Sequence, residues 1–535
     1  MKRNQFKLFY IAALSSVLAI SCTNLEIEES DSVFPEDTGG GFSGVKDPGS
    51  AVDALYNDVQ GQVGDQANLF ALNEVTTDEQ LVPTRGTDWG DNGIWRTLHS
   101  HTWSPTHQYI LNTWNNLNQN VFRASEVIDS RSNAPADVAA NAKFLRAWSM
   151  WWVLDFWGQV PFREVDEGPE INPRILSATE ALDLIVQDLN DAISGLPAVA
   201  APGGDDLERA SKAAARHLLA KVLLNKHIYL GTSPDSGDMN QVISLVDQIA
   251  AEGYALESGY FNIFREADDT ETIWWLGAAI GNRIFNGLHY NSTGISGGGW
   301  NGFSTLAEFY DLFEGDPNSN RGELDGTPLD GQEERRGWVP SSGTPFVEGE
   351  DPEVTNNGGY QDGSNVGLGF LIGQQYALDG SKLKDRPGND LVFTREFPGL
   401  VGNNERTGIR VQKYAARYDA FNPHQIVFRY ADTHLMKAEA IMRTGGDPTA
   451  MVNELRTLRG ATPLGSVSEQ DLLDERGREL YVEFARRQDM RRFGQYTRDW
   501  EFKDPSSVGD ATKELFPIPT NALLSNPNLV QNPGY

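Results

Sequence analysis

The sequence is almost free of cysteine: among 535 residues the only one is Cys22. A single thiol cannot close an intramolecular disulfide, so a disulfide framework is excluded. Long apolar runs are scarce as well. The run from Leu8 to Ile20 is too short to cross a bilayer as a helix. Hydrophobic residues nevertheless make up 39% of the chain and aromatic residues 10%, with 13 tryptophans, so we expect a globular protein with a substantial core.

Basic residues are also in short supply. Lys and Arg total 44 against 75 for Asp and Glu, which gives a formal net charge of −31. Such a surface repels phosphate backbones and argues against nucleic-acid binding. It also disfavours acidic polysaccharides unless basic groups are concentrated locally. The simplest interpretation of the charge is solubility, in keeping with a saline habitat.

The position of Cys22 is informative. Met1-Lys2-Arg3 is a basic start, the short apolar run follows, and Ala19-Ile20-Ser21-Cys22 ends it. This order is that of a signal peptide, and a cysteine at that place resembles a bacterial lipobox, in which the thiol is lipidated. Ala19 stands where Leu is usual. A plain secretory signal is the alternative. The Gly-rich segment 23–50 then predicts a flexible tether, and its acidic residues after Cys22 resemble a surface-export signal.

Helical periodicity marks two parts of the chain, at about 51–254 and 425–535. Ala142, Leu145, Trp148 and Trp152 repeat at helical spacing before a stop at Gly158. The stretches around Leu218 and Leu435 show the same helical spacing of apolar residues, and each also ends at a glycine. Small residues among the apolar ones favour helices packed in close pairs, as in tetratricopeptide-type arrays, although no clean 34-residue period is found. We expect Trp148, Trp151 and Trp152 to lie in the core.

Between about 255 and 424 the composition of the sequence changes. Gly, Asn, Asp and Ser dominate, helical periodicity disappears, and short strand-like runs such as 272–275 occur. We therefore predict a loop-rich lobe inserted between two helical parts. Loops carried on a rigid frame are where binding functions usually reside.

The last third of the chain contains its most distinctive patterns. Residues 472–494 predict one helix with Glu475, Glu479, Glu483, Arg487 and Arg491 at successive i+4 steps. We expect a salt-bridged, exposed face, with Glu483 paired to Arg487. The prolines of residues 515–535 predict an extended tail that lies along the helical frame.

Together these stretches resemble the SusD/RagB family. Arg478-Glu479-Leu480, Glu483, Arg487, Asp489 and Arg492 match its helix pattern, and Pro517-Ile518-Pro519 with 526–535 match its terminal pattern. Phe484 replaces the Gly usual after the second Glu. The stretches that begin at Leu145, Ala210 and Arg429 also match, so the resemblance covers nearly the whole chain.

The resemblance implies a mainly α fold: tetratricopeptide-like helical pairs form a scaffold for an irregular lobe with short β-strands, in a single body over 51–535. It implies an outer-membrane lipoprotein, anchored at Cys22 and facing the cell exterior. Such a protein captures glycan for a SusC-like TonB-dependent transporter, without catalysis and without a cofactor or metal.

Carbohydrate binding requires exposed aromatic rings that stack on sugar faces and planar polar groups that pair with hydroxyls. Three loop segments offer them. The first is 77–103, the second is 285–303, and the third surrounds Arg335-Arg336-Gly337. The candidate residues are Arg85, Asp88, Trp89, Asn92, Trp95, Tyr290, Trp300 and Trp338. Trp89 with Asn92, and Trp300, resemble sugar-contacting positions of the family's starch-binding member. Core packing is the alternative for each tryptophan.

Two other patterns do not indicate metal sites. His99 and His101 lie two positions apart, but no further ligand can be assigned, so we expect structural histidines. Asp316, Asn318 and Asn320 imitate the start of an EF-hand loop, yet Arg321 stands where Gly is required.

Two rival functions stay open. With 75 carboxylates the composition alone does not exclude a glycoside hydrolase. Neither an HExxH motif nor a phosphate-binding loop is present. The second rival is a helical scaffold lipoprotein that binds peptide or protein cargo. Among glycans, the acidic charge favours a neutral glucan as ligand.

Overall fold

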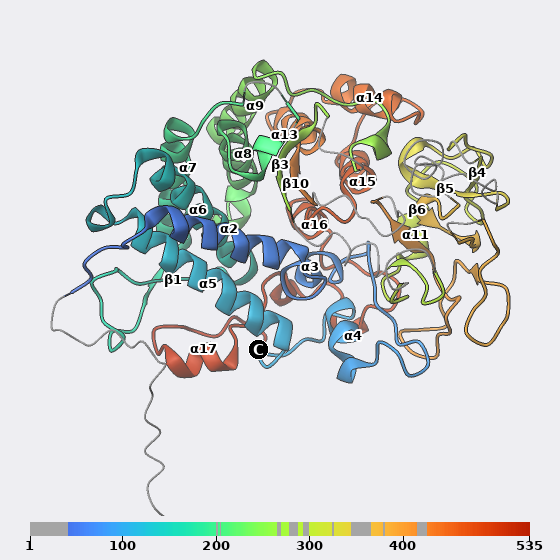
Figure 1. Cartoon of the computed structure of the whole chain (residues 1–535), viewed down its shortest axis with the longest axis horizontal. Coiled ribbons are helices and arrows are strands. Elements are labelled where there is room, and N and C mark those ends of the chain that lie inside the picture. Colours follow the sequence, from blue (N-terminus) through green and yellow to red (C-terminus); the bar gives the residue numbers. More distant parts are fainter. Residues whose placement is uncertain are drawn as a thin grey trace, which may run out of the picture. The chain divides into compact units, whose positions relative to one another are not determined.

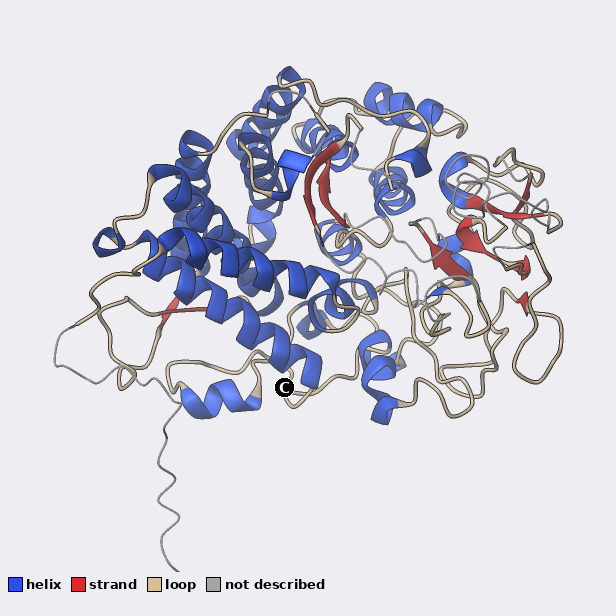
Figure 2. Ribbon diagram, in the orientation of Figure 1, coloured by secondary structure: helices blue, strands red, loops and turns tan. Residues whose placement is uncertain are grey.

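Helices dominate the structure, a computed structural model that describes residues 41–199, 202–203, 205–264, 269–277, 287–292, 299–323, 326–343, 365–377, 380–414 and 425–535. Figure 1 follows the chain and Figure 2 separates helices from strands. Cys22 and most of the predicted tether lie outside the described residues. Gly44–Tyr535 form one unit. The described helices include none that is both long and apolar enough to cross a membrane.

The helical frame follows the predicted pairing. Its first part comprises α2 (Pro48–Gly64), α3 (Asn68–Glu74), α4 (Ile94–His99), α5 (Gln108–Ile128), α6 (Ala136–Trp157), α7 (Ala178–Gly195), α8 (Lys212–Leu230) and α9 (Ser236–Ala251). Each helix from α5 to α9 packs on the next, and α13 (Tyr430–Arg443) packs on α9. The predicted stop after α6 is confirmed: Gly158, with φ of 68°, caps its end in the left-handed conformation.

The core of the frame contains the tryptophans of α6. Trp148, Trp151 and Trp152 are each at most 1% exposed and pack on one another and on Trp274 and Phe428. The last two belong to β3 (Thr272–Leu276) and β10 (Gln425–Arg429), which pair antiparallel. This ribbon places a strand near the start of the inserted lobe beside the strand that follows its end.

The lobe itself is loop-rich, with short strands, as expected (Figure 2). β4 (Arg321–Gly322), β5 (Gly337–Pro340), β6 (Leu368–Leu371) and β9 (Arg410–Gln412) form a four-stranded sheet. Two-stranded ribbons join β7 (Gly373–Gln374) to β8 (Val392–Phe393), and, on the frame, β1 (Val160–Phe162) to β2 (Arg174–Leu176). The short helix α11 (Ala307–Tyr310) packs aromatic side chains against Phe370 of the sheet. A mainly α fold with few short strands is thereby confirmed.

The prediction of one helix over 472–494 was wrong. The structure has α15 (Glu469–Leu480) and α16 (Arg486–Arg492), separated by a break. Within the break Val482 and Phe484 adopt left-handed φ values of 56° and 60°. Their N–H groups donate to the carboxylates of Glu79 and Glu74, each at 2.6 Å. The break therefore replaces helical hydrogen bonds with bonds to buried acids. Phe484 adopts the backbone conformation for which glycine is best suited.

The expected exposed ion-pair face is also wrong, because α15 is buried from Glu475 to its end at Leu480. Glu475 and Glu479 are completely buried. Glu479 binds Arg429 at 2.8 Å, Arg459 at 3.0 Å and Arg335 at 3.3 Å. Burial alone raises the pKa of Glu479, but the three guanidiniums outweigh it and hold that pKa well below its usual range. The network joins the lobe, through Arg335, to the frame.

The expected pair of Glu483 with Arg487 does not form either. Glu483 instead binds Arg429 at 2.7 Å and Lys413, while Arg487 forms an ion pair with Asp155 of α6. The helix break explains this, since residues on either side of it no longer share a helical face.

The terminal tail, residues 515–535, lies along the frame as predicted, but includes the short helix α17 (Thr520–Ser525) after Pro519. The helix α14 (Thr449–Leu458) precedes α15. The N–H of Phe516 donates to the carbonyl of Phe156 at 2.8 Å, and Trp103 Nε1 donates to the Tyr535 hydroxyl at 2.6 Å. The tail is thus an integral layer of the N-terminal part of the frame.

Candidate carbohydrate-binding surface

The first two predicted loop segments meet at one surface. A tight turn brings them together: Arg85 and Asp88 exchange two backbone hydrogen bonds of 2.9 Å, and Trp89 follows with φ of 57°. Trp89 Nε1 donates to the carbonyl oxygen of Trp300 at 2.7 Å. A bulky residue in the left-handed region is strained, and such strain concentrates at functional sites.

Trp89 stands edge-on against Phe303 and Trp95, with ring centroids 6.0 and 5.8 Å away. Its ring also lies directly against Gly302, where a Cβ atom would come within 2.3 Å of the indole. Position 302 must therefore be a glycine, because any side chain there would collide with the Trp89 ring. Trp89 is half-buried, held in place by packing, and its remaining surface is available to solvent.

Trp300 is the most exposed part of this surface. Its side chain is 57% exposed, and it is the one aromatic among the exposed large hydrophobic residues in the described ranges. Tyr290 completes the group, with its hydroxyl donating to Asp88 Oδ2 at 3.0 Å. We call Trp89, Tyr290 and Trp300 the aromatic platform. Asn92 lies exposed, three positions beyond Trp89, with φ of 52°.

Three of the candidate residues prove to be structural. Trp95 is 2% exposed, packs on Phe303 and donates to Asp91 at 2.9 Å, so it supports the platform from within the core. Arg85 is 2% exposed and binds the Ser304 hydroxyl at 2.7 Å as well as backbone carbonyls. Burial lowers the pKa of Arg85 to about 9, which leaves it charged at neutral pH.

Trp338 is the third, and here the expectation of an exposed ring is corrected. It is 6% exposed and packs edge-on against Phe261 in the lobe core. Gly322 and Gly326 lie so close to it that an added Cβ atom would meet the side chain within 3.0 Å. These glycines make room for a buried indole. The adjoining Arg335 and Arg336 are likewise buried.

Sequence reasoning missed Arg386, which comes to the platform from 298 positions away in the chain. Its guanidinium lies 4.2 Å from the centre of the Tyr290 ring and forms ion pairs with Asp88 and Glu405. Glu405 also accepts from His289 at 2.9 Å. The segment Arg386-Pro387-Gly388 indicated only a turn, so nothing in the sequence associated it with Trp89.

The carboxylates of Asp88 and Glu405 are both paired with Arg386 at this surface. Burial tends to raise the pKa of Asp88, but hydrogen bonds from Arg386 and Tyr290 outweigh it and hold that pKa below its usual range. The pKa of Glu405 is lowered for the same reason, by Arg386 and His289. Burial and the Asp88 carboxylate raise the pKa of Tyr290 to about 12. At neutral pH both carboxyls are therefore ionised and the phenol keeps its proton.

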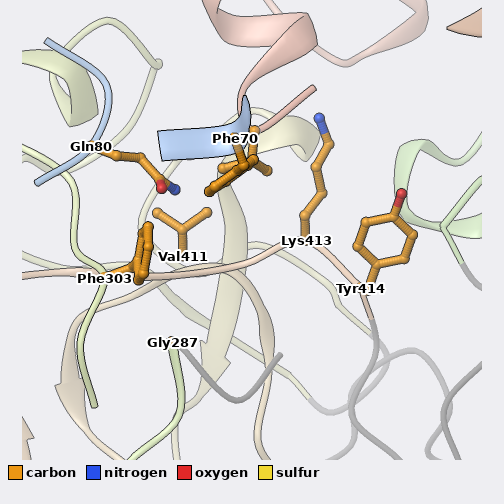
Figure 3. Close-up of a pocket in the computed structure, with 8 residues that line it drawn as sticks. Phe70, Gln80, Gly287, Phe303, Val411, Lys413 and Tyr414 are labelled. Atoms are coloured by element: carbon orange, nitrogen blue, oxygen red, sulfur yellow. The ribbon is translucent and has the colours of Figure 1, made fainter. Parts of the chain in front are cut away.

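A small cavity lies behind the platform, lined by Phe70, Gln80, Phe303 and Val411 among others (Figure 3). About 30 Å³ of it is open to the centre of a water molecule. That is room for one or two waters and not for a sugar ring. The rings that could stack on sugar therefore lie on the open surface and not in this cavity.

The buried histidines are structural, as expected. His99 lies 2.9 Å from the carbonyl of Glu501, and His101 lies 2.8 Å from that of Thr76. Within the described residues, no group of three or more His, Cys, Asp or Glu side chains is arranged to hold a metal ion.

Comparison with known proteins gives consistent matches. Residues 47–224 match a family model described as starch-binding and associating with the outer membrane. The chain is 27% identical, over the full length of both proteins, to the starch-binding protein SusD of Bacteroides thetaiotaomicron. A SusD-like protein of Bacteroides fragilis superposes with a TM-score of 0.65 at 20% identity, over 90% of this chain and 96% of the other.

A surface glycan-binding protein A of Bacteroides thetaiotaomicron, solved in complex with laminarihexaose, superposes with a TM-score of 0.61 at 17% identity. The superposition covers 91% of this chain and 98% of that one, and at such identity it shows a shared fold. Residues 270–535 match the model described as the SusD family. The two family models together cover most of the chain, and the chain belongs to the SusD family.

Proposed function

We propose that this protein is a lipid-anchored, surface-exposed glycan-binding protein that captures oligo- or polysaccharide for a SusC-like TonB-dependent transporter. The observation that carries the proposal is the exposure of Trp300, whose carbonyl oxygen accepts from Trp89, on the surface that also holds Tyr290. Apolar CH faces of sugars stack on such rings, while Asn92 and Asp88 lie close enough to pair with hydroxyl groups.

The names of the relatives support this role, since they are starch-binding or glycan-binding proteins. The charge state of the platform supports binding without catalysis. A glycoside hydrolase needs one carboxyl whose raised pKa keeps it protonated as a general acid. Asp88 and Glu405 both have a lowered pKa and both bind Arg386, so neither is a proton donor at neutral pH.

Apolar side chains exposed on the frame support a protein partner. Leu524 and Val530 of the terminal tail are 81% and 70% exposed, and Ile171 is 44% exposed. Asn528 donates to the carbonyl of Pro173 at 3.1 Å, which fixes the tail beside the loop that carries Ile171. Exposed apolar residues gathered in this way are typical of a protein interface, and the transporter is the partner that we propose for it.

Affinity electrophoresis tests the proposal. The chain from residue 23 onward contains the whole unit Gly44–Tyr535 and lacks the proposed anchor. It should be retarded in gels that contain a suitable polysaccharide from a broad panel, without release of sugar. Release of sugar would favour the hydrolase. Migration unaffected by every polysaccharide would refute glycan capture and favour the scaffold that binds peptide or protein.

A further inference from the structure

Arg386 reaches the platform on a hairpin that is fastened to the Tyr290 loop. The backbones of Lys384 and Asp390 form an antiparallel β-bridge within the hairpin. The Asn291 side chain donates to the Lys384 carbonyl at 2.8 Å. Lys384 and Arg386 are exposed while Asp385 between them is buried. The hairpin therefore directs Arg386 toward the solvent side of the platform.

The side chain of Arg386 is restrained but not covered. It is 49% exposed, although it contacts the Tyr290 ring and two carboxylates. Its Nε donates to Glu405 and one of its terminal nitrogens donates to Asp88. A guanidinium has five N–H donors, so the exposed edge retains donors for a ligand. Because the carboxylates fix its position, little conformational entropy is lost when a ligand binds.

Arg386 is the arginine of this surface that binds carboxylates: it forms ion pairs with Asp88 and Glu405. Arg85 and Arg410 are buried and bind carbonyl and side-chain oxygens behind the platform. Burial lowers the pKa of the His289 imidazole, which favours its neutral form.

From this geometry we propose that Arg386 is a specificity-determining contact residue of the platform, and that it binds adjacent hydroxyl groups of an uncharged sugar. The inference rests on the proposed function and narrows its substrate class. A planar guanidinium presents parallel donors that match two neighbouring oxygens. Asp88 and Glu405 already compensate its charge, so a carboxylate or sulfate that approaches Arg386 meets a guanidinium that is paired with two anions.

The experiment begins with the neutral polysaccharide that retards the wild-type chain most strongly. The same polysaccharide is then used after partial carboxymethylation or partial sulfation, so that only the charge differs. Arg386→Ala should weaken binding of the neutral form about tenfold or more, the scale of hydrogen bonds to a charged donor. Arg386→Lys should recover little of it. Arg321→Ala is the control, because Arg321 is exposed and paired with Asp330 in the same lobe, away from the platform.

A second variant, at Glu405, tests whether Arg386 contacts the glycan itself or only supports the rings of the platform. Glu405→Gln removes one compensating charge but keeps the guanidinium, so it should raise binding of the carboxymethylated form relative to the neutral form. Wild-type affinity for the neutral form should be the same from low to high NaCl concentration, since screening affects only charged ligands.

Three results would overturn the inference. Wild-type preference for a charged derivative, with affinity falling as salt rises, would show that Arg386 binds anions instead. An Arg386→Ala variant that binds like wild type, while Trp300→Ala does not, would leave the proposed function intact and remove Arg386 from it. Absence of binding to any polysaccharide by the wild type would refute the proposed function and the inference together.

Discussion

Truncation of Trp300 separates binding from folding more cleanly than any other change at the platform. With 57% of the side chain exposed and roughly 250 Å² for a whole tryptophan, ~140 Å² is open to solvent. A sugar face that covers about half of this area removes ~70 Å², worth ~1.8 kcal/mol at ~25 cal/mol per Å². Trp300→Ala should therefore raise the Kd about 20-fold.

The same change should lower the free energy of unfolding by at most ~2.7 kcal/mol, because the residue buries only ~110 Å² of its surface and such area-based values are upper bounds. Trp95→Ala is the matched contrast. Trp95 is 2% exposed, and its truncation should cost about 3–5 kcal/mol of unfolding free energy through loss of packing. Isothermal titration with the retained polysaccharide and urea denaturation measure the two quantities. The reasoning fails if Trp300→Ala binds like wild type, or if it destabilises the fold as much as Trp95→Ala.

Three further changes test the interior. Glu479→Gln should lower the free energy of unfolding, measured by urea denaturation, by about 3–5 kcal/mol, because it leaves buried guanidiniums uncompensated. Arg123→Ala, which removes an exposed ion pair, should lower it by less than ~1 kcal/mol. Burial lowers the pKa of His101 well below its unfolded value of 6.5. The unfolded chain therefore binds a proton at this residue more readily than the folded one, and the fold loses stability as the pH falls below 6.5. His101→Asn should make the decrease of Tm between pH 7 and pH 5 smaller. Phe484→Gly should relieve a left-handed φ yet lower Tm, because loss of the buried ring costs more than the ~1 kcal/mol of strain; a rise in Tm would contradict this.

The helical frame could be predicted from the sequence because its signals are local. Apolar spacing and the glycine that ends α6 act within a few residues of one another, and the structure follows them. The burial of α15 could not be predicted in this way. Glu475 and Glu479 have the i+4 spacing of an exposed ion-pair face, and only their enclosure by the lobe and the frame makes them interior.

The candidate site shows the same division. Trp89 and Trp300 were singled out because glycines surround them on loops, and the structure brings them into contact. The same argument misled at Trp338, where glycines from a neighbouring segment make room for a buried ring. Arg386 offered no local signal, because its role depends on partners that lie far from it in sequence.

The terminal tail has a consequence for the order of folding. Tyr535 closes a hydrogen bond with Trp103 across 432 positions, and Asn532 donates to the carbonyl of Trp157 across 375. The N-terminal helices therefore cannot complete their packing until nearly the whole chain is available. Contacts of such long range make folding slow. In the proposed role the chain is exported before it folds, and this delay would keep the polypeptide open until export is under way.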